Sequence, residues 1–175
     1  SLHLFNVARS TSASILRKVF DSAMFASRRK RKPGELEVLS REGRRVRIYE
    51  LQGELLFGNT ESVTLDMLAA LSEVDFLVID FKRVIAVDRA AIALLNDLCR
   101  RTADRDKRVF FTDCSQLYQF RKHLRLSGDV AQQPNWLSFD DSDRAVEWCE
   151  DQLIAEADLV ADEPDQAEGL CQHYL

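Results

Sequence analysis

The chain has 175 residues, of which 46% are hydrophobic and 30% charged, and its formal net charge is −5. This composition is typical of a soluble globular domain of ordinary size with extensions, and it argues against a wholly disordered chain. No apolar run approaches the roughly 20 residues that cross a bilayer, and no secretory signal is visible, so we expect neither membrane insertion nor secretion.

Charge is unevenly distributed along the chain. Residues 1–34 contain eight Lys or Arg and one acidic residue, whereas residues 155–175 contain six acidic residues and neither Lys nor Arg. This asymmetry predicts three parts: a basic leader over 1–34, one domain over 35–154, and an acidic tail over 155–175 without regular structure. Because the chain begins at Ser1 without Met, we interpret it as a piece of a longer protein.

The leader combines an apolar stripe with a run of cations. Apolar residues at helical spacing predict a helix over 10–27, after a region rich in Ser and Thr. Five adjacent cations at 28–32, followed by Pro33 and Gly34, predict a solvated linker. Such a cluster can contact nucleic acid, but no aromatic residues interleave with it and the domain beyond is acidic, so we expect no nucleic-acid partner.

The domain begins with β-type patterns. Weak alternation over 36–39 and clean alternation over 46–51 predict a hairpin with one buried face. Gly53 then interrupts the strand pattern. A short apolar stretch follows, and Asn59 or Thr60 is suited to cap a helix.

The middle of the domain contains the strongest strand pattern in the chain. Residues 76–81 form a continuous apolar run, which predicts a strand buried on both faces and closed by Asp80. Asp88 is a suitable N-cap for a helix over 88–99. These boundary roles explain both carboxylates, so we do not expect Asp80 and Asp88 to act as an acid–base pair.

Alternation of strands and helices continues to the acidic tail. A strand over 109–112, a helix from Ser115, a strand over 136–139 and a last helix capped within 140–143 complete the pattern. The order predicts an α/β fold: a mixed sheet of about four to five strands with helices packed on it, preceded by an N-terminal helix.

No catalytic or metal-binding constellation is visible in the sequence. Phosphate-binding loops, nucleophile elbows and metalloprotease motifs are absent. His3, His123 and His173 are far apart, and none of the four cysteines has a partner at zinc-ligand spacing. We therefore expect no catalysis by this chain, no metal and no cofactor.

The segment over 76–91, FLVIDFKRVIAVDRAA, resembles the signature of the STAS family of sulfate transporters and anti-sigma-factor antagonists. That pattern is an apolar strand ending in Asp, a short apolar turn, and a second Asp opening a helix. The upstream LQGELLFGN over 51–59 is similar to the motif before the family's first helix. The resemblance covers about 35–154 and implies the STAS fold. Some relatives are reported to bind nucleotides, which leaves nucleotide binding open here.

One departure bears on mechanism. In the antagonist branch, a serine that follows the second aspartate is phosphorylated, whereas this chain has Arg89 and then Ala90. Arginine cannot accept phosphate and is positively charged where a phosphate would be negative. We therefore favour the branch in which the domain is appended to a larger protein.

Two parent proteins are considered. Residues 1–12 are too short, too polar and too basic to end a membrane helix, which counts against a SulP-type anion transporter. They resemble the last strand and tail of a bacterial serine-dependent glutaminase domain, whose catalytic serine and lysine would lie upstream. The resemblance implies a non-catalytic regulatory or protein-interaction module at the C-terminus of a cytoplasmic glutaminase. An anti-sigma-factor antagonist is the third alternative.

The family resemblance also implies an interaction patch where two helices begin. Helix N-termini expose unpaired N–H groups, and Arg89 adds a cation, so an acidic partner is favoured there. We expect the partner to be the rest of the parent chain, another protein or a second copy, and the chain's own acidic segment 156–168 is a candidate occupant. The predicted patch consists of Gly58, Asn59, Thr60, Asp88, Arg89 and Ala90.

Overall fold

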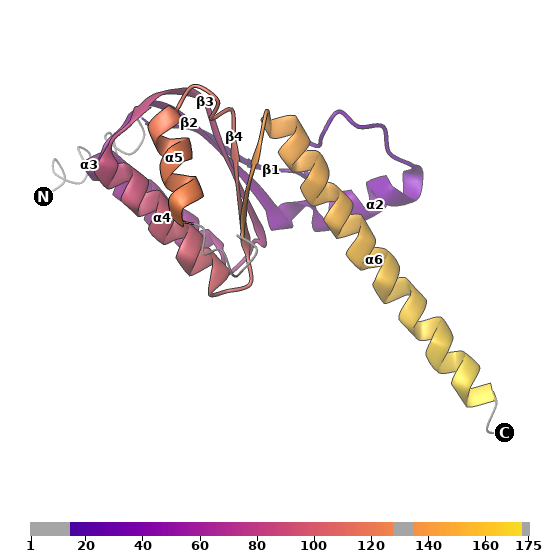
Figure 1. The fold of residues 1–175 in the computed structure, drawn as a ribbon. Helices are drawn as coiled ribbons and strands as arrows, with labels where there is room; N and C mark the ends of the chain where they lie inside the picture. The colour runs from indigo at the N-terminus through magenta and orange to yellow at the C-terminus, as the bar shows by residue number, and fades with distance from the viewer. Residues whose placement is uncertain (1–14, 128–134, 173–175) are drawn as a thin grey trace, which may run out of the picture.

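A five-stranded sheet lies between two layers of helices in the computed structural model, which describes residues 15–127 and 135–172 (Figure 1). The elements in chain order are β1 (Leu16–Asp21), α2 (Pro33–Glu42), η1 (Gly43–Arg45), β2 (Val46–Leu55), α3 (Phe57–Ala70), β3 (Phe76–Val87), α4 (Arg89–Ala103), β4 (Arg108–Thr112), α5 (Tyr118–Ser127), β5 (Trp136–Phe139) and α6 (Ser142–Gln172).

The strands follow one another across the sheet in chain order. β1 is antiparallel to β2, whereas β2, β3, β4 and β5 are mutually parallel. This mixed sheet of five strands with packed helices confirms the predicted α/β class. The carboxyl ends of the parallel strands lie at one edge of the fold, where the chain turns into α3 and α4.

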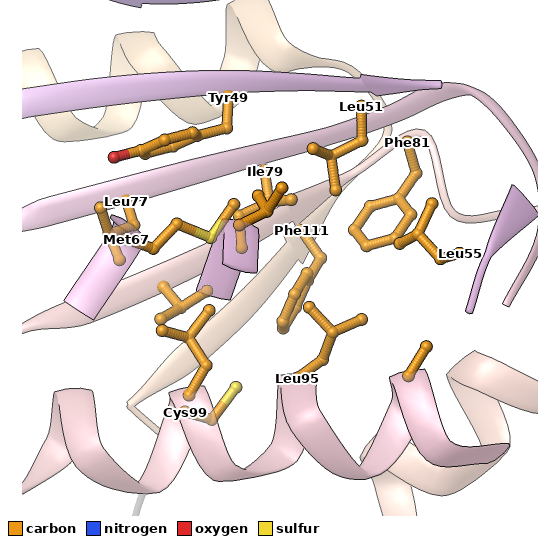
Figure 2. Close-up of a cluster of buried hydrophobic side chains, with 14 of the residues drawn as sticks. Tyr49, Leu51, Leu55, Met67, Leu77, Ile79, Phe81, Leu95, Cys99 and Phe111 are labelled. Carbon is orange, nitrogen blue, oxygen red and sulfur yellow. The ribbon is translucent and has the colours of Figure 1, made fainter. Parts of the chain in front are cut away.

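Each face of the sheet has its own hydrophobic core, because alternate side chains of a strand point to opposite faces. The larger core lies between the sheet and the α3, α4 and α5 layer, and includes Met67, Ile79, Leu95 and Phe111 (Figure 2). The smaller core lies under α2 and α6. The first part of β3 is buried on both faces, which explains the continuous run of apolar residues there.

The prediction of a helix over 10–27 is wrong for the residues of this range that the structure describes, because residues 16–21 form β1. Phe20 pairs with Ile48 of β2, and Val19 pairs with Tyr49. A β-branched and an aromatic residue favour a strand once a partner strand is available. The beginning of the leader, residues 1–14, lies outside the described residues.

The predicted hairpin is also wrong in one arm, because residues 36–39 belong to α2. Pro33 occupies the first turn of the helix, and the Glu35 carboxylate accepts a hydrogen bond of 2.8 Å from the Lys32 N–H. Both features favour a helix start. Leu39 is buried, whereas Leu36 is half exposed. The antiparallel partner of β2 is therefore β1 and not the segment over 36–39.

β2 and β3 extend further than the sequence pattern indicates. β2 continues through Gly53, which takes a φ of +75° at a shift in register with β3. β3 likewise passes Asp80 and ends at Val87, so Asp80 does not close the strand. β4 stops at Thr112, which pairs with Asp80. The two longer strands thus project as a ribbon beyond the rest of the sheet.

The last three elements match the sequence prediction in type, and β5 also has the predicted bounds. α5 begins at Tyr118 rather than at Ser115. Asp141 accepts a hydrogen bond of 2.9 Å from the Arg144 N–H at the start of α6, as expected of a cap. The expected tail without regular structure is corrected, because α6 continues from Ser142 to Gln172 and leads away from the sheet (Figure 1).

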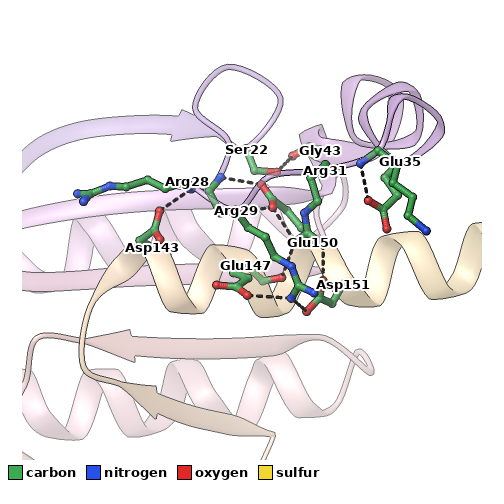
Figure 3. Close-up of polar contacts among 12 residues, drawn as sticks. Ser22, Arg28, Arg29, Arg31, Glu35, Gly43, Asp143, Glu147, Glu150 and Asp151 are labelled. Atoms are coloured by element: carbon green, nitrogen blue, oxygen red, sulfur yellow. Dashed lines mark hydrogen bonds and ion pairs between the residues drawn. The ribbon is translucent and has the colours of Figure 1, made fainter.

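The basic run at 28–32 is bound to α6 and is not a solvated linker (Figure 3). The Arg31 side chain is only 4% exposed and donates to Glu150 at 3.0 Å and to Asp151 at 2.5 Å. The Ser27 N–H and hydroxyl both donate to Glu150, at 2.8 and 2.5 Å. We name these interacting residues the basic clamp; its members are Ser27, Arg28, Arg29, Arg31, Asp143, Glu147, Glu150 and Asp151.

The clamp forms because α6 presents carboxylates on the side that faces the leader. Acidic residues at 143, 147, 150 and 151 recur at the three- and four-residue spacing that places side chains on one helical face. Burial alone would lower the pKa of Arg31, but hydrogen bonds and charges from Asp151 and Glu150 outweigh burial and raise it. The guanidinium is therefore held in its charged form against α6.

Candidate functional site

The starts of α3 and α4 lie side by side at the carboxyl end of the sheet. Leu55 ends β2 and pairs with Val87 at the end of β3, and the Asp88 N–H donates to the Leu55 carbonyl at 3.0 Å. Because each helix follows its strand directly, their first turns emerge together. The two segments of the predicted patch are therefore adjacent.

Asp88 acts as the expected helix cap. Its Oδ1 accepts a hydrogen bond of 2.7 Å from the Ala91 N–H, which satisfies one of the free donors of α4. Arg89 and Ala90 follow in the first turn and are exposed. Within the described residues, no ion pair is found for Arg89. The structure thus places an exposed cation beside a capped helix start.

Asn59 and Thr60 are used inside the fold. α3 begins at Phe57, and Asn59 Oδ1 accepts from the Leu56 N–H at 2.9 Å while its Nδ2 donates to the Glu54 carbonyl at 3.0 Å. Asn59 therefore stabilises the start of α3 from the third position of the helix. Thr60 is 1% exposed, so it cannot contact a partner directly. This corrects the predicted patch, whose exposed members are Gly58, Asp88, Arg89 and Ala90.

Exposed apolar side chains surround this end of the molecule and were not predicted. Phe57 is 50% exposed, Ile85 74% and Tyr118 70%, and Leu56 is similarly open. The sequence pattern indicated an apolar stretch before the helix, without indicating that its side chains are exposed. A sequence signal could have identified them. It is the position of apolar residues in the first turn of a helix, directly after a strand that leads away from the core.

A group of carboxylates lies where β4 stops. Asp80 is 5% exposed and pairs in register with Glu50 on β2 and Thr112 on β4. Burial, followed by the negative charges of Asp113 and Glu50, raises the pKa of Asp80, although the Lys82 N–H donates to it at 2.8 Å. The ionised form of Asp80 therefore costs stability in the folded state.

We predict that Asp80→Asn raises the melting temperature at neutral pH. The pKa of Asp80 in the folded state lies above its ordinary value of 3.8. The destabilisation by the ionised carboxylate is therefore fully present at pH values above the folded-state pKa, and it disappears as the pH falls below 3.8. The gain from the variant should therefore shrink to nothing in acid. Thermal unfolding of both proteins from pH 3 to pH 8 measures this, and a gain independent of pH would contradict it.

Cys99, Cys114 and Cys149 are not activated, and no metal cluster is found among the described residues. Burial raises the pKa of Cys99 and of Cys114 to about 12, and burial also raises the pKa of Cys149. These thiols are protonated at neutral pH and are poor nucleophiles. Over the described ranges, no group of three or more potential ligands is arranged to hold a metal ion. No helix there has the length and apolarity that a membrane span requires.

Comparison with known proteins identifies relatives of this fold. A family model described as "STAS domain" matches residues 37–128, which is more than half of the chain. The STAS domain of a SulP transporter from Vibrio cholerae superposes with a TM-score of 0.50 at 18% identity, covering 70% of this chain and 98% of that one. The structure of SLC26A9 superposes with a TM-score of 0.54 at 18% identity, covering 91% and 27%.

A curated relative extends the sequence similarity past the family model. Glutaminase 2 from Bradyrhizobium diazoefficiens is 27% identical over 154 residues, which is 87% of this chain and 24% of that protein. The chain therefore spans about a quarter of the length of this relative. The two superposed structures share the fold with this chain.

Proposed function

This chain belongs to the STAS domain family, and we propose that it is a non-catalytic interaction module of a larger cytoplasmic enzyme, a glutaminase. The single observation that carries the interaction role is the exposed surface at the carboxyl end of the sheet. There Arg89 lies unpaired among the described residues, and Phe57 and Ile85 are exposed on the segments that adjoin the paired ends of β2 and β3. Surfaces that combine an arginine with exposed aromatic and aliphatic groups are favourable for protein recognition.

The glutaminase assignment is supported by the extent of the curated match. The family model stops at residue 128, whereas the match to Glutaminase 2 covers 87% of the chain. That match must include part of the segments outside the family model, among them β1, β5 or α6. A parent whose sequence matches these flanking segments is favoured over SLC26A9, which covers 91% of the chain but shares only the fold at 18% identity.

A phosphorylation switch of the antagonist type is disfavoured by the residues at the start of α4. Val87, Asp88, Arg89, Ala90 and Ala91 contain no hydroxyl group. Ala91 is buried, and its N–H is engaged by the Asp88 cap. The helix start therefore offers a permanent cation where that branch of the family has a phosphate acceptor.

We expect the 175-residue chain to release no ammonia from glutamine, because the glutaminase chemistry belongs to the proposed upstream domain. A coupled assay on the purified chain tests this, and reading the coding sequence upstream of Ser1 tests the parent. Ammonia release that a substitution within residues 35–154 abolishes would overturn the non-catalytic role. Ten or more upstream apolar spans would establish a transporter instead.

We predict that Arg89→Glu weakens binding to the separately produced glutaminase region, with little change in stability. Arg89 is exposed and makes no ion pair with a described residue, so its reversal should shift Tm by no more than about 2 °C. Reversing a charge at the interface should lower the affinity by about tenfold or more, as measured by titration calorimetry.

Arg44→Glu is the matched control for this experiment. Arg44 is also exposed and has no ion pair among the described residues, but it lies in η1, before the start of β2 and at the opposite end of the sheet. The control should bind like the wild type. Equal effects of both variants would indicate a general charge effect, and unchanged binding with loss of stability in Arg89→Glu would make the patch structural.

A further inference from the structure

One edge of β3 has no partner strand over its last residues. β3 runs to Val87, but β4 ends at Thr112, opposite Asp80. On the other side, β2 pairs with β3 as far as Val87. Within the described residues, no strand therefore covers the β4 side of residues 82–87. No backbone hydrogen bond outside the ladders reaches residues 83–87 there either.

A hollow lies beside this free edge, between the end of β3 and the start of α5. It has a volume of about 320 Å³ and is lined by Ala86 and Val87 from β3 and by Leu117, Tyr118 and Phe120 from the α5 side. Phe120 and Leu117 are buried and form an apolar floor, whereas Tyr118 is 70% exposed. An apolar side chain of moderate size fits such a hollow.

The free edge is positively charged. Lys82 and Arg83 are exposed and have no ion pair with a described residue, and Arg89 follows in α4. Glu54 lies on the β2 side of the ribbon, paired in register with Ala86. Asp80 and Asp113 lie where β4 stops, so acidic groups of a ligand belong further along, towards Arg83 and Arg89.

We propose that residues 82–87 of β3, with the adjoining hollow, bind an extended segment of a partner protein as an added strand, with an apolar side chain in the hollow and acidic residues beside Arg83 and Arg89. Backbone hydrogen bonds to the free edge supply affinity, and the hollow supplies selectivity. This inference rests on the proposed interaction role and specifies the partner's chemistry.

Two other occupants fit less well. A second copy of the chain would bring two more cations, Lys82 and Arg83, to the same short edge, and charged edges oppose such pairing. The chain's own acidic segment is helical in α6 to Gln172 and leads away from this end of the molecule (Figure 1). The free edge therefore favours an extended segment of a partner protein that carries acidic and apolar side chains.

The test uses a fluorescein-labelled nine-residue peptide in which valine and isoleucine alternate with glutamate, titrated against the 175-residue chain by fluorescence anisotropy. N-methylation of alternate peptide amides removes strand hydrogen bonds and should weaken binding by about tenfold or more. Ala86→Trp, which fills the hollow, should weaken it by a similar factor, whereas Ala103→Trp at the exposed end of α4 should not. Hydrogen exchange should slow for backbone amides within residues 82–87.

The outcomes separate this inference from the proposed function. No peptide binding, equal binding of the N-methylated peptide, or equal binding by Ala86→Trp would overturn the added-strand proposal. If Ala86→Trp still bound the glutaminase region while Arg89→Glu did not, the interaction role would stand and the strand mode would be wrong. Loss of binding to the glutaminase region in both variants, together with slower hydrogen exchange of the amides within residues 82–87, would support both the interaction role and the added-strand mode.

Discussion

Replacing Arg31 with Met should destabilise the protein by about 3 kcal/mol, a fall of roughly 10 °C in Tm. The Glu150 side chain is 1% exposed, and without Arg31 its carboxylate would be buried without an ion-pair partner. The Ser27 donors to Glu150 would persist, and Asp151 is 41% exposed, so the loss should lie at the lower end for buried pairs. Arg31 Nε is buried without a hydrogen-bond partner, which offsets part of the stabilisation.

Lys30→Ala provides the matched control, because Lys30 belongs to the same basic run but is exposed and has no ion pair with a described residue. Its effect should lie within about 0.5 kcal/mol of zero. Adding Glu150→Gln to Arg31→Met should recover part of the loss, since it removes the buried charge. Chemical denaturation of the wild type and these three variants measures the differences in stability. Equal stabilities of Arg31→Met and Lys30→Ala would show that the clamp does not stabilise the fold.

Phe120→Ala should cost about 3–5 kcal/mol and loosen α5. The Phe120 ring is 1% exposed and lies 4.9 Å from the ring of Phe81 and 5.2 Å from that of Phe111, measured between centroids. These contacts hold α5 against the point where β3 leaves the rest of the sheet. Their loss should therefore also weaken binding of the alternating peptide.

Two variants separate packing from binding at this position. Phe120→Leu retains much of the apolar volume and should cost about 1.5 kcal/mol or less. Tyr118→Ala removes an exposed ring of the same helix and should leave stability nearly unchanged while it weakens peptide binding. If Phe120→Ala unfolded at the same denaturant concentration as Tyr118→Ala, the aromatic cluster would not be what fixes α5.

Elements were predicted well where one local pattern was enough. The continuous apolar run at 76–81 and the Asp88 cap both lie where the sequence places them, because burial on two faces and an N-cap each leave a local signature. The family resemblance over 51–59 and 76–91 also identified the segments that meet at the carboxyl end. Arg89 is exposed there, but its role in recognition stays a prediction.

The failures share a physical cause, which is that partners distant in sequence decided the outcome. The stripe that suggested a helix before residue 21 became β1 because β2 offered an open edge. The basic run was expected to be solvated, but carboxylates about 120 residues later bind it. Tertiary contacts of this kind override local propensity, and no single segment reveals them. The free edge of β3 was invisible for the same reason, since it depends on where β4 stops.

The anchoring of the leader determines where bending can occur between this domain and any region before it. Gly43 lies so close to the turn after β1 that a Cβ there would come within 2.7 Å of the Ala23 backbone nitrogen, and Ser22 donates to the Gly43 carbonyl at 3.0 Å. With β1 in the sheet and the basic clamp on α6, residues 16–31 form a rigid strap. A pull on the chain at Ile15 would therefore act directly on the edge of the sheet, because residues 16–31 are held at both ends.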